Sequence, residues 1–492
     1  MDEQNRMTAG RQRPRGNRKR RPKWLRTLRR YWPPIRFGLI CLGLLLILIW
    51  IISGVFRLVS GLVEDLTETT EPATSESTEP TLSQAQIQAQ IDEIMAQADF
   101  IAAGYDYLSA IELLQASEHY ASSAEMQAKV TEYTVQDGQL VSYPEMNNIT
   151  HVFFHTLVAD NERCFDGDST EAGYNQYMTT ISEFNKMMES MYERGYVLVS
   201  PYDVAYEVTD ESGTHFVQGD IRLPEGKIPF LMSQDDVCYY GYMLGDVDPE
   251  FQRPAVPHPE GDGFAHKIVI DENGYPTCEY MDAQGNITTG AYDLVPLLEN
   301  FIQEHPDFSY HGARAMLAMT GYEGVFGYRT KPAYEAALGT EAYQAECAAA
   351  SEVAQCLRDH GWVLASHSYG HHAYGNYTAA EVEQDADKWD ATVEPIIGQV
   401  DVLIYPNGSD IAGVEQYTMD NAKFAALYED GFRYFFNVDS AYAWCQLGQN
   451  YYRGGRRNLD GYRMYYNPDS LSDLFDVDEV WDPARTTPVP PI

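Results

Sequence analysis

The chain has 492 residues, 44% of them hydrophobic, which excludes a protein that is disordered throughout. Its formal net charge of −39 is unevenly divided, because residues 1–57 carry 14 Lys and Arg residues and only two acidic ones, leaving 20 basic and 71 acidic residues in the rest. An acidic remainder of this size argues against a nucleic-acid partner and against binding to anionic wall polymers.

A transmembrane helix is predicted over 37–57, because residues 37–56 contain no charged side chain and 20 residues of helix just span a bilayer core. A cleaved signal peptide is the alternative, although its apolar core is normally shorter. The basic tail, 1–36, could suggest nucleic-acid binding or a nuclear signal, but before an apolar helix it obeys the positive-inside rule. We therefore expect a cytoplasmic N-terminus, a plasma-membrane location and an extracellular remainder.

The next two segments connect this anchor to the main body. Residues 58–83 include a Thr-, Glu-, Ser- and Pro-rich stretch that cannot support a core and is predicted to be a solvated linker. Residues 84–137 show helical spacing of apolar side chains and predict two or three packed helices. They resemble one tetratricopeptide helix pair, but three repeats are needed for a free-standing array, so a helical spacer is favoured, with a protein partner as an open alternative.

From residue 148 to 492 short apolar runs alternate with amphipathic helices. The runs cover 150–158, 196–200, 228–236, 312–319, 362–368 and 402–408, and the helices between them cover 174–195, 292–305, 331–360 and 378–398. Such alternation predicts a parallel sheet covered by helices, either open or closed into a barrel. Asn-Gly and Gln-Gly-Asn turns between alternating residues predict a small β-meander inserted at about 264–291. The cysteines show no CxxC spacing, and any disulfide pairing stays open.

Polar side chains follow three of the predicted strands, at the ends where sites gather in α/β folds. Asp235 and Asp236 end the run IPFLMSQDD, although two adjacent acids alone are usually a solvated turn. The turn Pro406-Asn407-Gly408 follows VLIY. His367 and His371, in WVLASHSYGHH, lie four residues apart on a turn, which allows about 6 Å between imidazoles and hence one shared metal ion; a hydrogen-bonded loop is the alternative.

His151 and His155 are also four residues apart, in THVFFHTLV. In a β-strand this spacing separates them by about 13 Å, so they cannot share an ion.

The ordered combination of these strand ends resembles the NodB-like polysaccharide deacetylases, carbohydrate esterase family four. Ser233-Gln234-Asp235-Asp236-Val237 stands where the family has Thr-Phe-Asp-Asp-Gly, and His367-Ser368-Tyr369-Gly370-His371 matches its His-Ser/Thr-x-x-His motif. Tyr405-Pro406-x-Gly408 is similar to the branch that acts on poly-N-acetylglucosamine. The resemblance implies an irregular (β/α) barrel of about seven strands and a divalent metal, zinc by expectation.

By this resemblance Asp235 would be the general base, and Asp236, His367 and His371 would hold the metal. Such a metal, with one carboxylate and two imidazoles, keeps open positions and lowers the pKa of water. The backbone N–H of Asn407 could stabilise the oxyanion. The function implied is removal of N-acetyl groups from an extracellular amino-sugar polymer, of a cell wall or an exopolysaccharide.

Three departures from the family pattern bear on this expectation. Val237 replaces a glycine, so the turn there must be made differently. Ile404 stands where much of the family has an arginine that orients the base; Arg456 or Arg457, of which we favour Arg457, could take that role, the alternative being a salt-bridged surface turn. No histidine follows His372, so the family's usual proton donor is missing.

Aromatic and histidine side chains near the motifs are candidates for substrate contact. Tyr369 and Tyr405 flank the expected ligands, and aromatic faces suit pyranose rings, although tyrosine is also ordinary core material. His155 resembles the Tyr-His that opens the poly-N-acetylglucosamine branch and could border the site, or could be a hydrogen-bonded strand-end residue. A glycan-binding or scaffold protein that has lost catalysis is the rival function, and O-acetyl esters are an open alternative substrate.

Overall fold

The computed structural model describes residues 83–245, 261–439 and 442–492. The predicted cytoplasmic tail, the transmembrane helix at 37–57 and nearly all of the linker lie outside these residues. Among the helices that are described, none is both long enough and apolar enough to cross a membrane. The six cysteines of the described part are free thiols.

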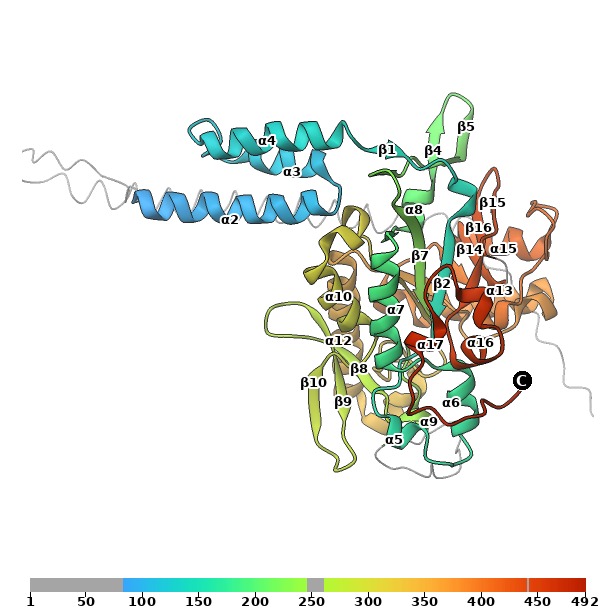
Figure 1. The fold of residues 1–492 in the computed structure, drawn as a ribbon. Helices are drawn as coiled ribbons and strands as arrows, with labels where there is room; N and C mark the ends of the chain where they lie inside the picture. Colours follow the sequence, from blue (N-terminus) through green and yellow to red (C-terminus); the bar gives the residue numbers. More distant parts are fainter. Residues whose placement is uncertain (1–82, 246–260, 440–441) are drawn as a thin grey trace, which may run out of the picture. The chain divides into compact units, whose positions relative to one another are not determined.

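Seven parallel strands close into a barrel at the centre of the described chain (Figure 1). In the order of their pairing around the ring they are β7 (Ile228–Gln234), β11 (Met316–Met319), β12 (Val363–Ser366), β13 (Val402–Ile404), β14 (Tyr434–Val438), β16 (Tyr452–Asn458) and β2 (Thr150–Phe154), which returns to β7. The predicted irregular (β/α) barrel is therefore confirmed.

The irregularity of the barrel arises at β7, which pairs with three strands. Its first residues pair with β3 (Tyr196–Leu198), and its last two, Ser233 and Gln234, pair with β11. A further strand, β15 (Cys445–Leu447), pairs antiparallel with β16 outside the ring. Because all seven ring strands are parallel, their carboxyl ends open on one end of the barrel, and the residues that follow them lie close together.

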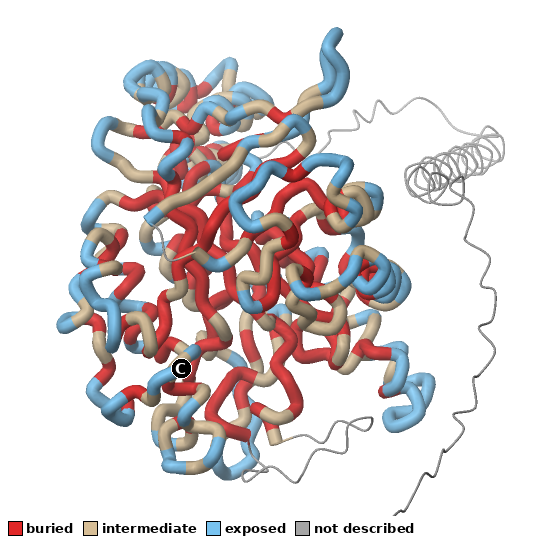
Figure 2. Tube along the Cα trace, turned by 90° about the vertical axis from the view of Figure 1, so that its right-hand side faces the viewer, coloured by how far each residue is buried: buried red, intermediate tan, exposed pale blue. Residues whose placement is uncertain are grey.

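Side-chain alternation along each strand separates two buried layers. Residues that point into the barrel form one apolar cluster, which includes Leu231, Met316, Ala318, Val363, Ala365, Val402, Ile404 and Phe436. Their neighbours in sequence point outward and pack against the helices, as Met232, Leu317, Leu364, Leu403 and Phe435 do. Figure 2 shows the result, with buried segments at the centre and exposed ones outside. Because side chains alternate along a strand, the next inward-pointing residue, two positions further along, projects into the open end of the barrel.

Amphipathic helices cover the outside of the barrel between successive strands. The longer ones are α7 (Ile181–Glu193), α10 (Leu294–Glu304), α12 (Thr340–Asp359), α13 (Ala379–Thr392) and α15 (Ala422–Asp430). α7 illustrates why they form: Thr180 and Glu183 make a capping box, and Phe184, Met187, Met188 and Met191 recur on one buried face. The shorter helices are α5 (Asn161–Cys164), α6 (Glu171–Tyr177), α8 (Pro201–Val204), α9 (Gly241–Leu244), α11 (Glu335–Leu338), α14 (Glu394–Ile397), α16 (Gly461–Tyr466) and α17 (Val477–Val480).

Smaller antiparallel elements decorate the barrel. The predicted meander is present as β8 (Ala265–Ile270), β9 (Pro276–Met281) and β10 (Ile287–Gly290). A hairpin that we did not predict joins β4 (Ala205–Asp210) to β5 (Gly213–Gln218), and β1 (Val141–Ser142) pairs with β6 (Arg222–Leu223).

The helical segment before the barrel contains three helices, α2 (Gln84–Ala103), α3 (Tyr107–Ala116) and α4 (Ala124–Asp137), around their own small core. It is fastened to the barrel domain by the Tyr105 hydroxyl, which donates to the Asp307 carbonyl at 2.9 Å, and by an ion pair between Arg222 and Asp137.

Candidate active site

Asp235 lies at the carboxyl end of β7 and is bound by a buried arginine. It is 3% exposed, and its two carboxylate oxygens accept hydrogen bonds from Nη1 and Nη2 of Arg456 at 2.6 and 2.9 Å. Burial alone would raise the pKa of Asp235, but the positive charge of the hydrogen-bonded Arg456 outweighs it and holds this pKa well below its usual range. Asp235 is therefore an oriented, ionised carboxylate.

The arginine that orients Asp235 is Arg456 and not Arg457, which corrects our expectation. Strand β16 places successive side chains on opposite faces, so Arg456 points into the barrel, where it is fully buried, and Arg457 points outward. Arg457 pairs instead with Asp473, at 2.7 and 2.8 Å. The alternative, a salt-bridged surface turn, is not found either, because both arginines lie on a buried strand.

Asp236, His367 and His371 form a cluster that could hold a metal ion. Each offers one ligand atom, and these atoms all lie within 4.8 Å of one another. His371 Nε2 is 3.8 Å from Asp236 Oδ2, and His367 Nε2 is 3.8 Å from Asp235 Oδ2, so the cluster adjoins the ionised carboxylate. Among the described residues, this is the one group of three or more His, Cys, Asp or Glu side chains whose ligand atoms lie close enough together to hold a metal ion.

The surroundings of His367 and Asp236 favour their metal-binding forms. His367 Nδ1 lies 2.8 Å from the Ile404 carbonyl, an acceptor that requires the proton on Nδ1 and leaves Nε2 as a lone-pair donor facing the cluster. Burial lowers the pKa of His367, which favours the neutral ring. The second oxygen of Asp236 accepts a 2.5 Å hydrogen bond from the Tyr240 hydroxyl. One carboxylate and two imidazoles are a donor set that suits zinc and similar divalent ions.

Left-handed backbone conformations gather at this end of the barrel. Asp236, Ser368, His371 and Asn407 have φ between 53° and 59°, a region that non-glycine residues rarely adopt and that recurs at functional sites. The conformation at Asp236 also explains the missing glycine, because the turn is made one residue earlier. Val237 is buried, and its N–H donates to the Ala318 carbonyl at 3.0 Å.

Asp385, on α13, holds the loop that carries His371, a role that the sequence did not reveal. Its carboxylate accepts the backbone N–H groups of Tyr369 and Gly370 at 2.8 and 3.1 Å and the Tyr374 hydroxyl at 2.8 Å. His372, unassigned from sequence, turns to the same carboxylate, with Nε2 3.4 Å from Asp385 Oδ1. The third histidine of the loop is therefore outside the metal cluster.

Arg456 makes a second polar contact besides that with Asp235, to a residue of β7. Its Nη1 donates to the Ser233 hydroxyl at 3.1 Å, and Ser233 also lies 3.0 Å from Nε2 of the buried His151. Burial, together with the charge of Arg456, lowers the pKa of His151 well below its usual value, so this ring is neutral. His151 is thus part of the support of the site, and neither it nor His155 belongs to the metal cluster.

The three residues expected to contact substrate differ in position. Tyr405 directly follows β13 and is fully buried, with its hydroxyl 3.0 Å from that of Tyr417, so its assignment as a substrate residue is wrong. The ring of Tyr369 is packed over Gly321. His155 follows β2 directly and is half-buried, and it is an electrostatic neighbour of both Asp235 and Asp460. Asn407 is exposed in the turn after β13.

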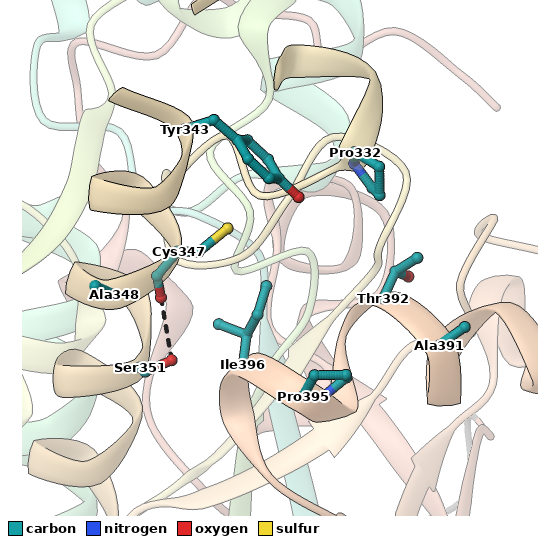
Figure 3. Close-up of a pocket in the computed structure, with 9 residues that line it drawn as sticks. All are labelled: Pro332, Tyr343, Cys347, Ala348, Ser351, Ala391, Thr392, Pro395 and Ile396. Atoms are coloured by element: carbon teal, nitrogen blue, oxygen red, sulfur yellow. Dashed lines mark hydrogen bonds between the residues drawn. The ribbon is translucent and has the colours of Figure 1, made fainter. Parts of the chain in front are cut away.

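The structure also contains a pocket of about 380 Å³ between α12 and the α13–α14 corner (Figure 3). Its mostly apolar walls include Tyr343, Cys347 and Ile396, and none of the residues that line it belongs to the Asp235 site. The candidate active site is therefore defined by its charged groups rather than by this pocket.

No protein-family model and no curated protein matches the chain. Among solved structures it is similar to the Streptococcus pyogenes deacetylase PplD in complex with acetate, with a TM-score of 0.34 and 12% sequence identity, over 68% of this chain and 98% of that one. The assignment of a chemistry to this chain therefore rests on its own side chains.

Proposed function

We propose that the protein is a metal-dependent hydrolase that removes N-acetyl groups from an extracellular amino-sugar polymer. The observation that carries the proposal is the adjacency of an ionised, arginine-bound carboxylate, Asp235, to a cluster of one carboxylate and two imidazoles, Asp236, His367 and His371. An ionised acid beside a cation site is an arrangement that can hydrolyse an unactivated amide.

Asp236, His367 and His371 would hold the divalent metal, which we propose to be zinc. When bound, it supplies an acidified water and a Lewis acid for the acyl oxygen. Asp235 takes the proton from the attacking water, and Arg456 fixes the direction of its oxygens. The backbone N–H of Asn407, at the neighbouring strand end, is proposed as a donor to the oxyanion.

Breaking the carbon–nitrogen bond requires a proton on the departing amine, and we propose His155 as its source. It stands directly after β2, the strand beside β7, at the same end of the barrel as Asp235. Its influence on the pKa values of Asp235 and Asp460 indicates that it lies near both carboxylates. The oxygen of the attacking water first bonds to the acyl carbon, which gives the oxyanion. The carbon–nitrogen bond then breaks as the nitrogen takes the proton, and the products are acetate and a free sugar amine. His155 would thus replace the donor that the sequence lacks after His372.

An extracellular polymer is proposed as substrate because of the apolar segment 37–56 and its basic flank, which suit a single-pass plasma-membrane anchor with the barrel outside. The three-helix segment, α2 to α4, would then separate the barrel from the membrane and could bind a protein partner.

The test is acetate release from N-acetylglucosamine oligomers by the zinc-loaded, full-length protein. We expect release by the wild type and none above background by Asp235→Asn or His367→Ala. Bound metal and bound glycan without release by the wild type would instead support the rival function, a glycan-binding protein that has lost catalysis.

A further inference from the structure

Aromatic side chains lie near the candidate active site on two helices, α6 and α16, and at Trp481, which follows α17. Tyr177 ends α6, and Tyr462, Tyr465 and Tyr466 lie on α16, next to Trp481. We call these five residues the aromatic strip. Tyr177, Tyr465 and Tyr466 are each 40% exposed, which leaves part of each ring accessible to a ligand.

The strip begins at the active site. The ring of Tyr177 is 6.4 Å from that of His155, centroid to centroid, and His155 is the proposed proton donor. Strands β2 and β16 are neighbours in the barrel. Helix α16 begins shortly after β16, and α6 follows β2 after the short helix α5, so both helices belong to segments that leave the end carrying Asp235.

The two helices of the strip are packed together without space for a side chain between them. A Cβ atom on Gly461 would lie 2.1 Å from the Asn175 carbonyl oxygen, so only glycine permits the contact. The Thr179 hydroxyl, just after α6, donates to the Leu459 carbonyl, just before α16, at 2.5 Å. The C-terminal segment fixes both helices, since Gln176 donates to the Pro490 carbonyl and Tyr466 to the Val489 carbonyl. These contacts therefore fix the position of the α6 ring relative to the rings of α16.

Ring contacts make the remainder of the strip continuous. Centroids are 4.6 Å apart for Tyr462 and Tyr466, 5.0 Å for Tyr466 and Tyr465, and 6.0 Å for Tyr465 and Trp481. Flat apolar faces with polar edges suit the C–H faces and hydroxyl rims of pyranose rings. An uncharged N-acetylated glycan also carries no charge for this acidic chain to repel.

We propose that the aromatic strip binds the sugar units of a glycan chain that extend beyond the unit held at Asp235. This inference rests on the proposed function and deepens it, because it assigns residues that hold the polymer beyond the deacetylated unit and makes long chains better substrates than short ones. Short oligomers reach only the active-site end of the strip, at Tyr177, whereas long ones extend to the rings beyond it, including Tyr465.

The test compares an N-acetylglucosamine dimer with a hexamer on the zinc-loaded, full-length protein, using KM for acetate release and Kd from titration calorimetry. We expect Tyr465→Ala to raise both constants for the hexamer about fivefold, the loss of one aromatic contact, and to leave the dimer unchanged. Tyr465→Phe, which keeps the ring, should behave as wild type. Tyr206→Ala removes an equally open tyrosine on the distant β4 hairpin and should change neither constant.

Equal changes of KM and Kd for dimer and hexamer in Tyr465→Ala, or no change for either, would contradict the proposed role of the aromatic strip. The two proposals can fail separately. Acetate release that does not depend on Tyr465 contradicts only the glycan-binding role of the aromatic strip. Hexamer binding that is weakened in Tyr465→Ala, in a protein that releases no acetate, contradicts only the deacetylase function.

Discussion

Arg456 reaches across the barrel from β16 to β7 and places its two terminal nitrogens 2.6 and 2.9 Å from the two carboxylate oxygens of Asp235. Both side chains are almost completely buried, so neither charge has water as an alternative partner. Removing one member of such a pair leaves the other charge uncompensated, which is far more damaging than losing a surface ion pair.

Arg456→Ala should therefore lower the free energy of unfolding by about 3–5 kcal/mol and abolish acetate release. Arg456→Lys keeps the charge but loses the two-pronged contact, and it should recover part of the stability and little of the activity. Arg457→Ala is the matched control on the same strand. Urea denaturation and acetate release measure the two effects; a larger loss of activity in Arg457→Ala than in Arg456→Ala would refute the assignment.

The lowered pKa of Asp235 makes a prediction about acid stability. Its pKa in the fold is below the unfolded value of about 3.9, so the ionised group stabilises the fold above about pH 4, and this contribution is lost as the pH falls toward the folded pKa. Asp235→Asn removes the titration. With chelator present, the difference in unfolding free energy between wild type and Asp235→Asn should be constant from about pH 5 to 7 and decrease below about pH 4. A difference that grows on acidification is the contrary outcome.

Metal content should depend on Asp236, His367 and His371 and not on His372. After zinc loading and dialysis, Asp236→Asn, His367→Ala and His371→Ala should each retain much less than one metal ion per chain. His372→Ala should retain the metal, because His372 faces Asp385. Elemental analysis of the purified proteins decides this, and a metal-free His372→Ala would show that the ligands are wrongly assigned.

Asp385 acts on the site only through the loop whose backbone it holds. Removing such an outer partner typically reduces metal affinity about tenfold or more. We expect Asp385→Asn to raise the Kd for zinc by about that factor, in competition with a chelating dye, while Asp387→Asn, an exposed acid of the same helix, leaves it unchanged. Identical zinc affinity in the two variants would exclude the role.

His155 can be tested through the leaving group. An amine must be protonated to depart, whereas p-nitrophenolate leaves without a proton. His155→Ala should therefore lose at least about a hundredfold in kcat on the amide and much less on p-nitrophenyl acetate. Equal losses on the two substrates would mean that His155 does not donate the proton.

The barrel and the proximity of His367 and His371 could be predicted from sequence because their signals are local, whereas only the family resemblance of the ordered motifs joins Asp236 to them. Each strand is a short apolar run with polar residues at its end, and the four-residue spacing of His367 and His371 on a turn fixes their proximity. The turn at Asp236 could not be placed, because Val237 gives no sign that the preceding residue adopts the left-handed conformation.

The mistakes concern which face of a strand a residue occupies. Arg456 and Arg457 are adjacent in RGGRRN, a sequence without apolar alternation, so nothing local tells which of them points inward. In VLIY every residue is apolar, so the sequence likewise does not tell that Val402 and Ile404 point into the barrel and Tyr405 points out. Asp385 lies on a helix distant in sequence from the loop that it holds, and only the folded chain brings them together.

The most direct test of the central claim, that Asp235 is the base beside a metal held by Asp236, His367 and His371, is acetate release by wild type and Asp235→Asn at matched zinc content. The account predicts one zinc per chain in both proteins, with acetate released from N-acetylglucosamine oligomers by the wild type and a loss of at least about a hundredfold in Asp235→Asn. Equal release by the two zinc-loaded proteins would contradict it.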